Sequence, residues 1–281
     1  MSIKIENLKY VYMKNGPYEK EALSGINLTI EDGEFVGLIG HTGSGKSTLI
    51  QHLNGLLKPS EGTVFLDGQD IFAKETNLKE IRSKVGLVFQ YPEYQLFEDT
   101  VAKDVAFGPK NYGLDKEEID SRVRDAVKMV GLSEEILDKS PFELSGGQKR
   151  RVAIAGVLAM NPQILVLDEP AAGLDPYGRE QILSELRYLH ETRKITVILV
   201  SHSMEDIARY AGRIVVMHKG KIVMAGTPAE IFSQSEKLEE IRLDVPQVTK
   251  ILDLLAQQGY QIPKGIFSVQ EAASVIKRIL S

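Results

Sequence analysis

A glycine-rich segment at residues 40–47 combines residue types that bind phosphate groups. It reads GHTGSGKS and lies between an apolar run at residues 35–39 and a helix-like stretch that begins at Thr48. Glycines let the backbone wrap closely around phosphate oxygens, and amides at a helix amino terminus attract negative charge. This spacing in a strand-loop-helix setting predicts a site for a nucleoside triphosphate with a divalent cation. The alternative is a glycine-rich turn that binds nothing.

The side chains of this segment have separate expected tasks. Lys46 would reach the outer phosphates as a point charge, and the Ser47 hydroxyl would ligate Mg²⁺. The residues predicted to bind nucleotide here are Gly40, His41, Thr42, Gly43, Ser44, Gly45, Lys46, Ser47 and Thr48.

Two adjacent acids, Asp168 and Glu169, follow an apolar strand-like run at residues 164–167. An acid at a strand end beside a phosphate loop can hold Mg²⁺ through water. The next acid is placed to orient and deprotonate an attacking water. Two carboxylates after a buried strand are costly unless a cation or hydrogen bonds compensate them. The alternative is a solvated Asp-Glu-Pro turn.

A third motif, LSGGQ at residues 144–148, predicts a second anion site. Ser145 is a good helix cap, and Gly146 and Gly147 leave the amides of the helix start bare. The phosphate loop already has amides and a lysine of its own, so this second site must serve something else. A capped helix with accidental glycines is the alternative.

Composition limits the classes of function that remain. The 281 residues are 43% hydrophobic and 26% charged, which is typical of a globular protein. The absence of cysteine excludes disulfides and thiolate chemistry, and the net charge of −5 gives no general attraction to nucleic acid. The apolar run at residues 195–200 is far shorter than a membrane helix, and the first ten residues have no apolar signal core. We therefore expect a chain that spans no membrane and is not exported.

The elements that position these motifs can be predicted from periodicity. Residues 164–167 and 196–200 are unbroken apolar runs, as in parallel strands covered on both faces, and residues 179–193 predict the crossover helix between them. Residues 92–151 are helical and charged, and two amphipathic helices follow Pro228. The sequence predicts an α/β nucleotide-binding core, an inserted helical part and a carboxy-terminal extension.

In their order and spacing, these motifs resemble those of ATP-binding-cassette ATPase subunits over about residues 3–230. Gln90 resembles the glutamine of the Q-loop, and Asp175 resembles the aspartate of the D-loop. His202 resembles the switch histidine. Tyr12 resembles the aromatic residue that stacks on adenine. Taken alone, Tyr12 could equally belong to the core, and a lone histidine after a strand is more often structural. Ala172 departs from the serine that the family often has.

The resemblance implies a fold and a division of the chain. The expected fold is a P-loop NTPase (RecA-like) α/β core with an antiparallel β subdomain and an inserted α-helical subdomain, plus a small helical carboxy-terminal extension. Residues 1–230 would form the ATPase domain, with the helical subdomain inserted at about residues 91–151. Residues 231–281 would form the extension, which could serve as a dimerisation element.

The resemblance also implies a mechanism in which two cassettes face each other head to tail. Each ATP would lie between one chain's phosphate loop and the other's LSGGQ. The resemblance assigns Glu169 as the base and His202 as the contact to the γ-phosphate. Mg²⁺ would bind with ATP at Ser47, Gln90 and Asp168. The residues that would act on the partner's nucleotide are Ser145, Gly146, Gly147 and Gln148.

Within the family, the segments at residues 89–97 and 104–109 resemble the energy-coupling factor transporter ATPases, as does the tail after Pro246. His41 indicates the second of their two ATPase types. The resemblance implies uptake of vitamins or transition-metal ions at the cytoplasmic face of the membrane. The implied partners are a second ATPase subunit (identical or paralogous), a transmembrane coupling protein and a membrane substrate-binding protein.

Three rival interpretations remain open. The chain could serve another importer or an exporter, or act as a soluble cassette ATPase on DNA or ribosomes. Such soluble proteins usually carry a coiled insertion or two fused cassettes, and this chain has one core and an acidic balance. It could also be a regulatory nucleotide-binding module without turnover.

Overall fold

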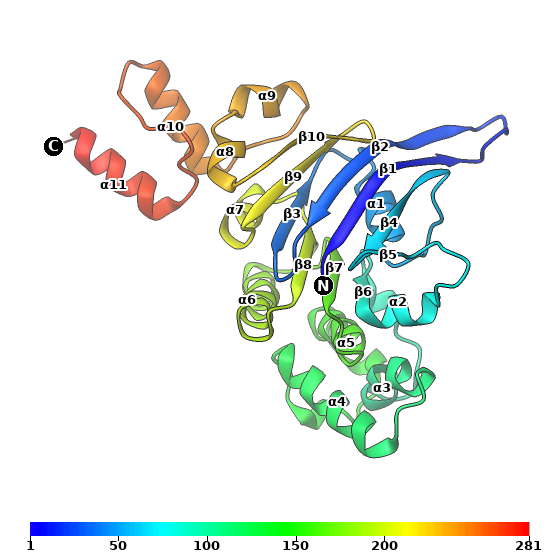
Figure 1. Cartoon of the computed structure of the whole chain (residues 1–281). Coiled ribbons are helices and arrows are strands. Elements are labelled where there is room, and N and C mark those ends of the chain that lie inside the picture. Colours follow the sequence, from blue (N-terminus) through cyan, green and yellow to red (C-terminus); the bar gives the residue numbers. More distant parts are fainter. Residues whose placement is uncertain (281) are drawn as a thin grey trace.

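The computed structural model describes residues 1–280, with side chains to residue 279. Within those residues the strands form a four-stranded sheet and a six-stranded sheet, with helices around them (Figure 1). This arrangement confirms the predicted α/β class.

The six-stranded sheet has the order β10-β9-β3-β8-β7-β6 and carries the predicted nucleotide motifs. Pairing from β9 to β6 is parallel, and β10 pairs antiparallel with β9. β3, β6, β7 and β8 are buried along their whole length, which explains their unbroken apolar sequences. The strands are β3 (Phe35–Ile39), β6 (Val85–Val88), β7 (Ile164–Asp168), β8 (Thr196–Val200), β9 (Arg213–His218) and β10 (Lys221–Gly226).

The four-stranded sheet has the order β2-β1-β4-β5 and is antiparallel throughout. β1 and β2 form a long hairpin that projects from the body of the molecule (Figure 1). Buried and exposed residues alternate along parts of these strands because one face packs on the core. The strands are β1 (Ile3–Tyr12), β2 (Lys20–Ile30), β4 (Glu61–Leu66) and β5 (Gln69–Asp70).

Helices between β6 and β7 form a layer at one end of the molecule (Figure 1). This segment starts just after Gln90 and ends with the helix that begins at Gly146, within LSGGQ. Its longest helices are α3 (Val101–Asn111), α4 (Lys116–Met129) and α5 (Gly146–Leu158), with short 3-10 turns η1 (Pro92–Gln95), η2 (Glu134–Ile136) and η3 (Pro141–Glu143).

The remaining helices join the strands of the two sheets. The predicted crossover helix between β7 and β8 is α6, and it starts three residues earlier than the sequence indicated. These helices are α1 (Lys46–Leu53), α2 (Leu78–Lys84), α6 (Pro176–Arg193), α7 (Met204–Tyr210), α8 (Pro228–Phe232) and α9 (Ser235–Glu240).

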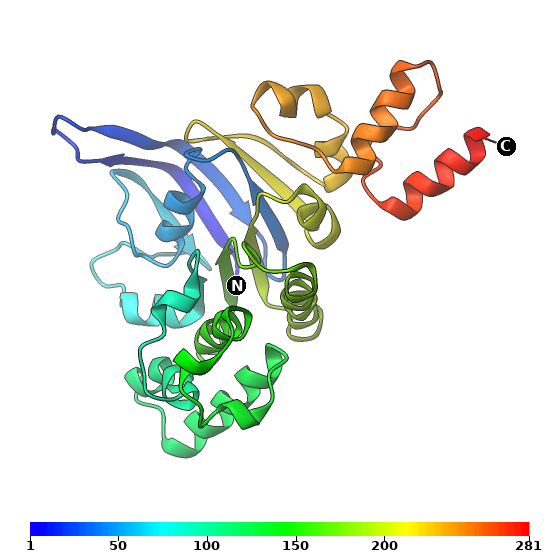
Figure 2. The same ribbon diagram turned by 180° about the vertical axis from the view of Figure 1, so that it is seen from behind.

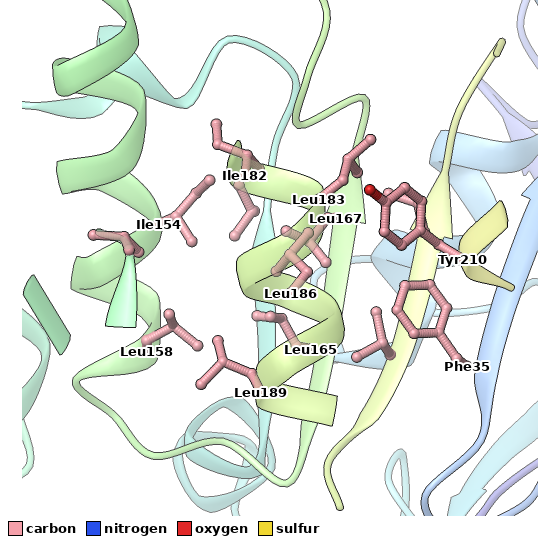
Figure 3. Close-up of a cluster of buried hydrophobic side chains, with 14 of the residues drawn as sticks. Phe35, Ile154, Leu158, Leu165, Leu167, Ile182, Leu183, Leu186, Leu189 and Tyr210 are labelled. Atoms are coloured by element: carbon pink, nitrogen blue, oxygen red, sulfur yellow. The ribbon is translucent and has the colours of Figure 1, made fainter. Parts of the chain in front are cut away.

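The hydrophobic core joins the large sheet to the helical layer. In Figure 3 side chains of α6, Ile182 and Leu186 among them, lie between β7 and the α5 residues Ile154 and Leu158. All four are at most 6% exposed. The core therefore couples the strand that ends in Asp168 to the helix that begins after Ser145.

The chain ends in two helices, α10 (Gln247–Gln257) and α11 (Val269–Leu280), as predicted. They lie at the far end of the molecule from α3 and α4 (Figure 2). Leu252 packs with Ala272 and Val275 in a small cluster separate from the main core. Val245, just before α10, belongs to the main core. No helix within the described residues is long and apolar enough to cross a membrane.

Candidate active site

The phosphate loop connects the central strand β3 to α1, as the sequence predicted. Its glycines are required where the loop passes close to neighbouring backbone. A Cβ on Gly40 would lie 2.4 Å from the Met217 carbonyl oxygen, and one on Gly45 would lie 2.7 Å from that of Ala22. Gly45 also has a φ of 106°, which other residues rarely adopt. The loop is therefore fixed by its packing on β9 and β2.

Lys46 lies folded across this loop. Its Nζ donates hydrogen bonds to the carbonyl oxygens of Gly40 (2.6 Å) and His41 (3.3 Å), and the residue is 6% exposed. Burial lowers the pKa of Lys46, while the carboxylates of Glu169 and Asp168 oppose that shift. The ammonium is held where a phosphate group would approach the loop amides.

The two acids predicted at the end of β7 lie beside Lys46. Burial raises the pKa of Asp168, against a hydrogen bond from Ser47 and the charge of Lys46. Burial and the neighbouring Asp168 raise the pKa of Glu169 to about 7, and Lys46 partly offsets this. Glu169 is thus poised to change protonation state near neutral pH, as a general base must.

Glu169 and His202 face each other across adjacent strand ends. Glu169 has a φ of 53°, and its amide donates to the Val200 carbonyl oxygen at 3.0 Å, which joins the ends of β7 and β8. The Oε1 of Glu169 lies 3.5 Å from the Nε2 of His202. Burial and the charge of Lys46 lower the pKa of His202, so the imidazole is neutral at physiological pH.

These motifs converge on one cavity of about 220 Å³. Ten of the predicted site residues line it: Thr42, Gly43, Gly45, Lys46, Ser47, Thr48, Gln90, Asp168, Glu169 and His202. They come from the ends of β3, β6, β7 and β8, which meet at one edge of the sheet because these strands are parallel.

Tyr12, the predicted adenine-stacking residue, lies at the end of β1 and is 37% exposed. Its hydroxyl is 3.1 Å from the Thr48 Oγ1 on the cavity wall. Its ring meets Tyr10 edge to face, with centroids 4.8 Å apart, and Tyr10 meets His52 in the same way. The ring is therefore held at the rim of the cavity.

Two further loop residues point elsewhere. The ring of His41 packs on His218 with centroids 4.9 Å apart, and its Nδ1 lies 2.7 Å from the Thr42 carbonyl oxygen. Ser44 is fully buried, and its carbonyl oxygen accepts a hydrogen bond from the Gly220 amide at 2.9 Å. Both residues, like Gly40, hold the shape of the loop rather than line the cavity.

The LSGGQ residues and Asp175 do not line this cavity. Ser145 and Gln148 form a reciprocal capping box at the start of α5, with bonds of 3.3 Å and 3.0 Å. A Cβ on Gly146 would meet no atom within 4 Å, so this helix start is open. Asp175 caps α6 and accepts from the Gly178 amide at 2.6 Å.

Sequence reasoning missed Arg150, which the structure places at the centre of the site's supporting contacts. It is 3% exposed and forms an ion pair with Glu93. The signal was its spacing, because Arg150, Ile154 and Leu158 recur every four residues on the buried face of α5. A charge within an apolar stripe indicates a buried partner.

The oxygen atoms on the cavity wall suit Mg²⁺. Mg²⁺ is usually bound by one or two carboxylates together with phosphate oxygens. Ser47 and Asp168 both line the cavity, and a divalent cation there would offset the burial that raises the pKa of Asp168. No group of three or more histidine, aspartate or glutamate side chains within the described part of the chain could hold a metal by itself. A cation here would therefore share its ligands with the nucleotide.

Comparison with known sequences gives matches along the whole chain. A profile described as "ABC transporter" matches residues 23–172. The chain is 58% identical to the energy-coupling factor transporter ATP-binding protein EcfA2 of Caldanaerobacter subterraneus subsp. tengcongensis, covering 100% of this chain and 98% of that protein. It is 57% identical to EcfA2 of Clostridium tetani, with the same coverage.

Comparison with solved structures gives the same fold. The structure of cbiO1 from Clostridium perfringens, described as part of the ABC transporter complex cbiONQ, has a TM-score of 0.75 at 39% identity and covers 89% of this chain and 98% of its own. A dimeric post-hydrolysis structure of the ATP-binding cassette MJ0796 with ADP and Pi has a TM-score of 0.72 at 35% identity, covering 80% and 98%. These neighbours confirm the predicted P-loop NTPase fold.

Proposed function

The chain belongs to the ABC transporter family as an ATP-hydrolysing transport ATPase of the energy-coupling factor type, and on that premise we propose that it powers uptake of vitamins or transition-metal ions. The relatives named above are called EcfA2, the second of the two ATPases of energy-coupling factor transporters. His41 indicated this second ATPase in the sequence. Their similarity extends through the carboxy-terminal extension.

The observation that carries the ATPase part of the proposal is the single cavity on which the phosphate loop, Gln90, the two acids and His202 converge. A triphosphate in this cavity would contact the amides of residues 43–47 and the ammonium of Lys46. Hydrolysis then needs a water molecule aligned with the γ-phosphate and a base to take its proton.

Glu169 supplies that base. Its carboxylate accepts the proton of the attacking water at the cavity wall, and neutral His202, 3.5 Å away, donates a hydrogen bond toward the γ-phosphate oxygens. Mg²⁺, when bound with ATP at Ser47, Gln90 and Asp168, would neutralise phosphate charge. Most of the rate enhancement comes from positioning and charge stabilisation, since the reaction needs little covalent chemistry.

The position of LSGGQ is the reason to propose a second cassette. Ser145, Gly146, Gly147 and Gln148 lie outside this chain's own cavity, and their helix start is open. In the proposed complex they complete the nucleotide-binding site of a partner ATPase subunit, and Asp175 lies at the interface between the two subunits. ATP then bridges the two chains, and hydrolysis removes the bridging charge.

The proposed division of the chain follows its topology. Residues 1–230 form the ATPase domain, the helical subdomain is inserted at about residues 91–151, and residues 231–281 form an extension that serves dimerisation. The aromatic stretch at residues 91–97 is the proposed contact with a transmembrane coupling protein. The chain would then lie at the cytoplasmic face of the membrane, with a separate membrane protein binding the cargo.

A pull-down through a tagged full-length chain from native membranes tests this assignment. We expect a second ATPase subunit, a multispanning coupling protein and a small membrane substrate-binding protein to copurify and be identified by mass. Reconstituted vesicles with ATP on the ATPase side should then accumulate the cargo of that substrate-binding protein. Copurification of an exporter, or of ribosomes or DNA, would replace the proposal with one of its rivals.

A further inference from the structure

Arg150 joins three segments that each carry part of the site. It lies on α5, five residues after Ser145. Its Nε and Nη2 donate to the two carboxylate oxygens of Glu93, at 3.0 Å and 2.6 Å. Glu93 stands in η1, three residues after Gln90. The guanidinium therefore links α5, the helix that begins within LSGGQ, to the segment that follows Gln90.

The third segment follows Glu169. The Nη1 of Arg150 donates to the carbonyl oxygens of Pro170, at 3.4 Å, and of Ala172. Pro170 is the residue directly after Glu169, and Ala172 lies three residues before Asp175. The position of the base and the start of the loop toward Asp175 are thus tied to the same side chain.

The ion pair between Arg150 and Glu93 is buried. Arg150 is 3% exposed and the Glu93 side chain 16% exposed. Burial acts to raise the pKa of Glu93, but the hydrogen bonds and charge of Arg150 outweigh it and keep that pKa below its usual range. The ring of Tyr91 adds a cation-π contact, 5.9 Å from the guanidinium carbon. A buried ion pair with every donor nitrogen engaged has few alternative geometries.

We propose that Arg150 is a positioning residue for ATP hydrolysis, holding Gln90 and Glu169 in register with the helix that presents LSGGQ to the partner cassette. The inference rests on the proposed function, because it assumes that LSGGQ engages a partner's nucleotide. A shift of α5 on that engagement would move Glu93 and the Pro170 carbonyl with it. Engagement of the partner would in this way shift both Glu169 and Gln90, the residue that would hold Mg²⁺.

The test compares Glu93→Gln and Arg150→Lys in the complex that copurifies with the full-length chain. Both variants keep side-chain size but lose the two-point ion pair. We expect kcat at saturating MgATP to fall about tenfold or more, while the Kd for a fluorescent ATP analogue changes less than about threefold. The Mg²⁺ concentration for half-maximal rate should rise, because Gln90 is displaced.

The matched control is Glu180→Gln, which breaks an equally short two-point pair with Arg209 on the exposed face of the molecule. Its kcat should stay within about twofold of the unmodified complex. A double-mutant cycle with Gln90→Ala adds a readout that a purely structural role would not change. Glu93→Gln should cost little further activity in the Gln90→Ala background, because both changes would remove the proposed contact of Gln90 to Mg²⁺.

Two results would overturn the inference. One is an unchanged kcat per bound nucleotide in both variants, whatever their melting temperature, since Arg150 would then only stabilise the fold. The other is full additivity with Gln90→Ala. Failure of the proposed function looks different, because the full-length chain would then copurify without a second ATPase subunit.

Discussion

The Oε1 of Glu169 lies 3.5 Å from the Nε2 of His202 and, within the described residues, accepts no hydrogen bond. A buried carboxylate oxygen without a donor is costly, and its cost is relieved when it binds a proton. The arrangement suits a group that must take a proton from water in each catalytic cycle.

The first prediction concerns Glu169→Gln. The amide keeps the shape of the side chain but cannot accept the proton, so kcat should fall by a factor of about 10² to 10⁴ with MgATP affinity retained. The variant should accumulate as a closed dimer with its partner subunit, visible by light scattering in MgATP. Hydrolysis at the unmodified rate would remove Glu169 from the mechanism.

The second prediction concerns pH. Because burial and Asp168 raise the pKa of Glu169 to about 7, and the base acts deprotonated, kcat/KM should rise as pH increases through about 7 and then level off. The ratio kcat/KM is the appropriate measurement because it reports the nucleotide-free enzyme. A profile that is flat between about pH 6 and pH 8 would contradict the assignment.

The third prediction concerns the free energy of unfolding, which depends on pH because the pKa of Glu169 is raised in the folded state. The folded state holds the Glu169 proton to about pH 7, and the unfolded state releases it near 4.5, so the free energy of unfolding falls as pH rises between these values. Above pH 7 the full cost is up to about 3 kcal/mol. Glu169→Gln should therefore be more stable than the unmodified chain at pH 8, with the difference vanishing near pH 4.5.

Denaturant unfolding at the two pH values measures this difference. The control is Glu117→Gln, an exposed position on α4, which should show no such gap. Equal unfolding free energies of Glu169→Gln and the unmodified chain at pH 8 would show that the carboxylate is compensated in the folded state.

The fourth prediction concerns the aromatic stretch at residues 91–97. Tyr94 is 84% exposed and Phe97 59%, although aromatic side chains usually pack in cores. Replacing both by Ala should abolish transport while nucleotide binding stays within about twofold, because neither residue lines the cavity. Tyr188→Ala, an exposed tyrosine on α6, is the control. Unchanged transport would exclude this surface as the contact with the membrane partner.

The fifth prediction concerns the carboxy-terminal extension. Val245 belongs to the main core and is kept when residues 247–281 are removed, while α10, α11 and Phe267, which packs against that core, are lost. We expect the truncated chain to fold and bind MgATP but to separate from its partner when nucleotide is removed. Size-exclusion chromatography checks this, and an intact nucleotide-free complex would refute the role.

Much of the site could be predicted from the sequence because its chemistry is encoded in short contiguous segments. GHTGSGKS requires glycine at Gly45, where a Cβ would approach a carbonyl oxygen at 2.7 Å. The strand before Asp168 reads as buried because it is covered on both faces. Such local requirements leave a direct trace in residue type.

Contacts between segments far apart in the sequence could not be predicted in the same way. The bonds from Arg150 reach back 57 residues and forward 22, and nothing in the spacing of its neighbours identifies Glu93 as the partner. The hydroxyl contact between Tyr12 and Thr48 depends on how the β1–β2 hairpin folds over α1, which periodicity does not determine. Helix α2 was not predicted, because only Ile81 of its seven residues is buried.

The place of β6 at the margin of the large sheet has an evolutionary consequence. The helical layer leaves the sheet after this outermost strand and returns at its neighbour, β7, so no hydrogen bond of the ladder between β3 and β8 passes through it. Sequence drift on the exposed surface of that layer, away from the buried face of α5 that carries Arg150, can follow a changing transporter partner without disturbing the catalytic strands. One ATPase core could in this way serve many different transporters.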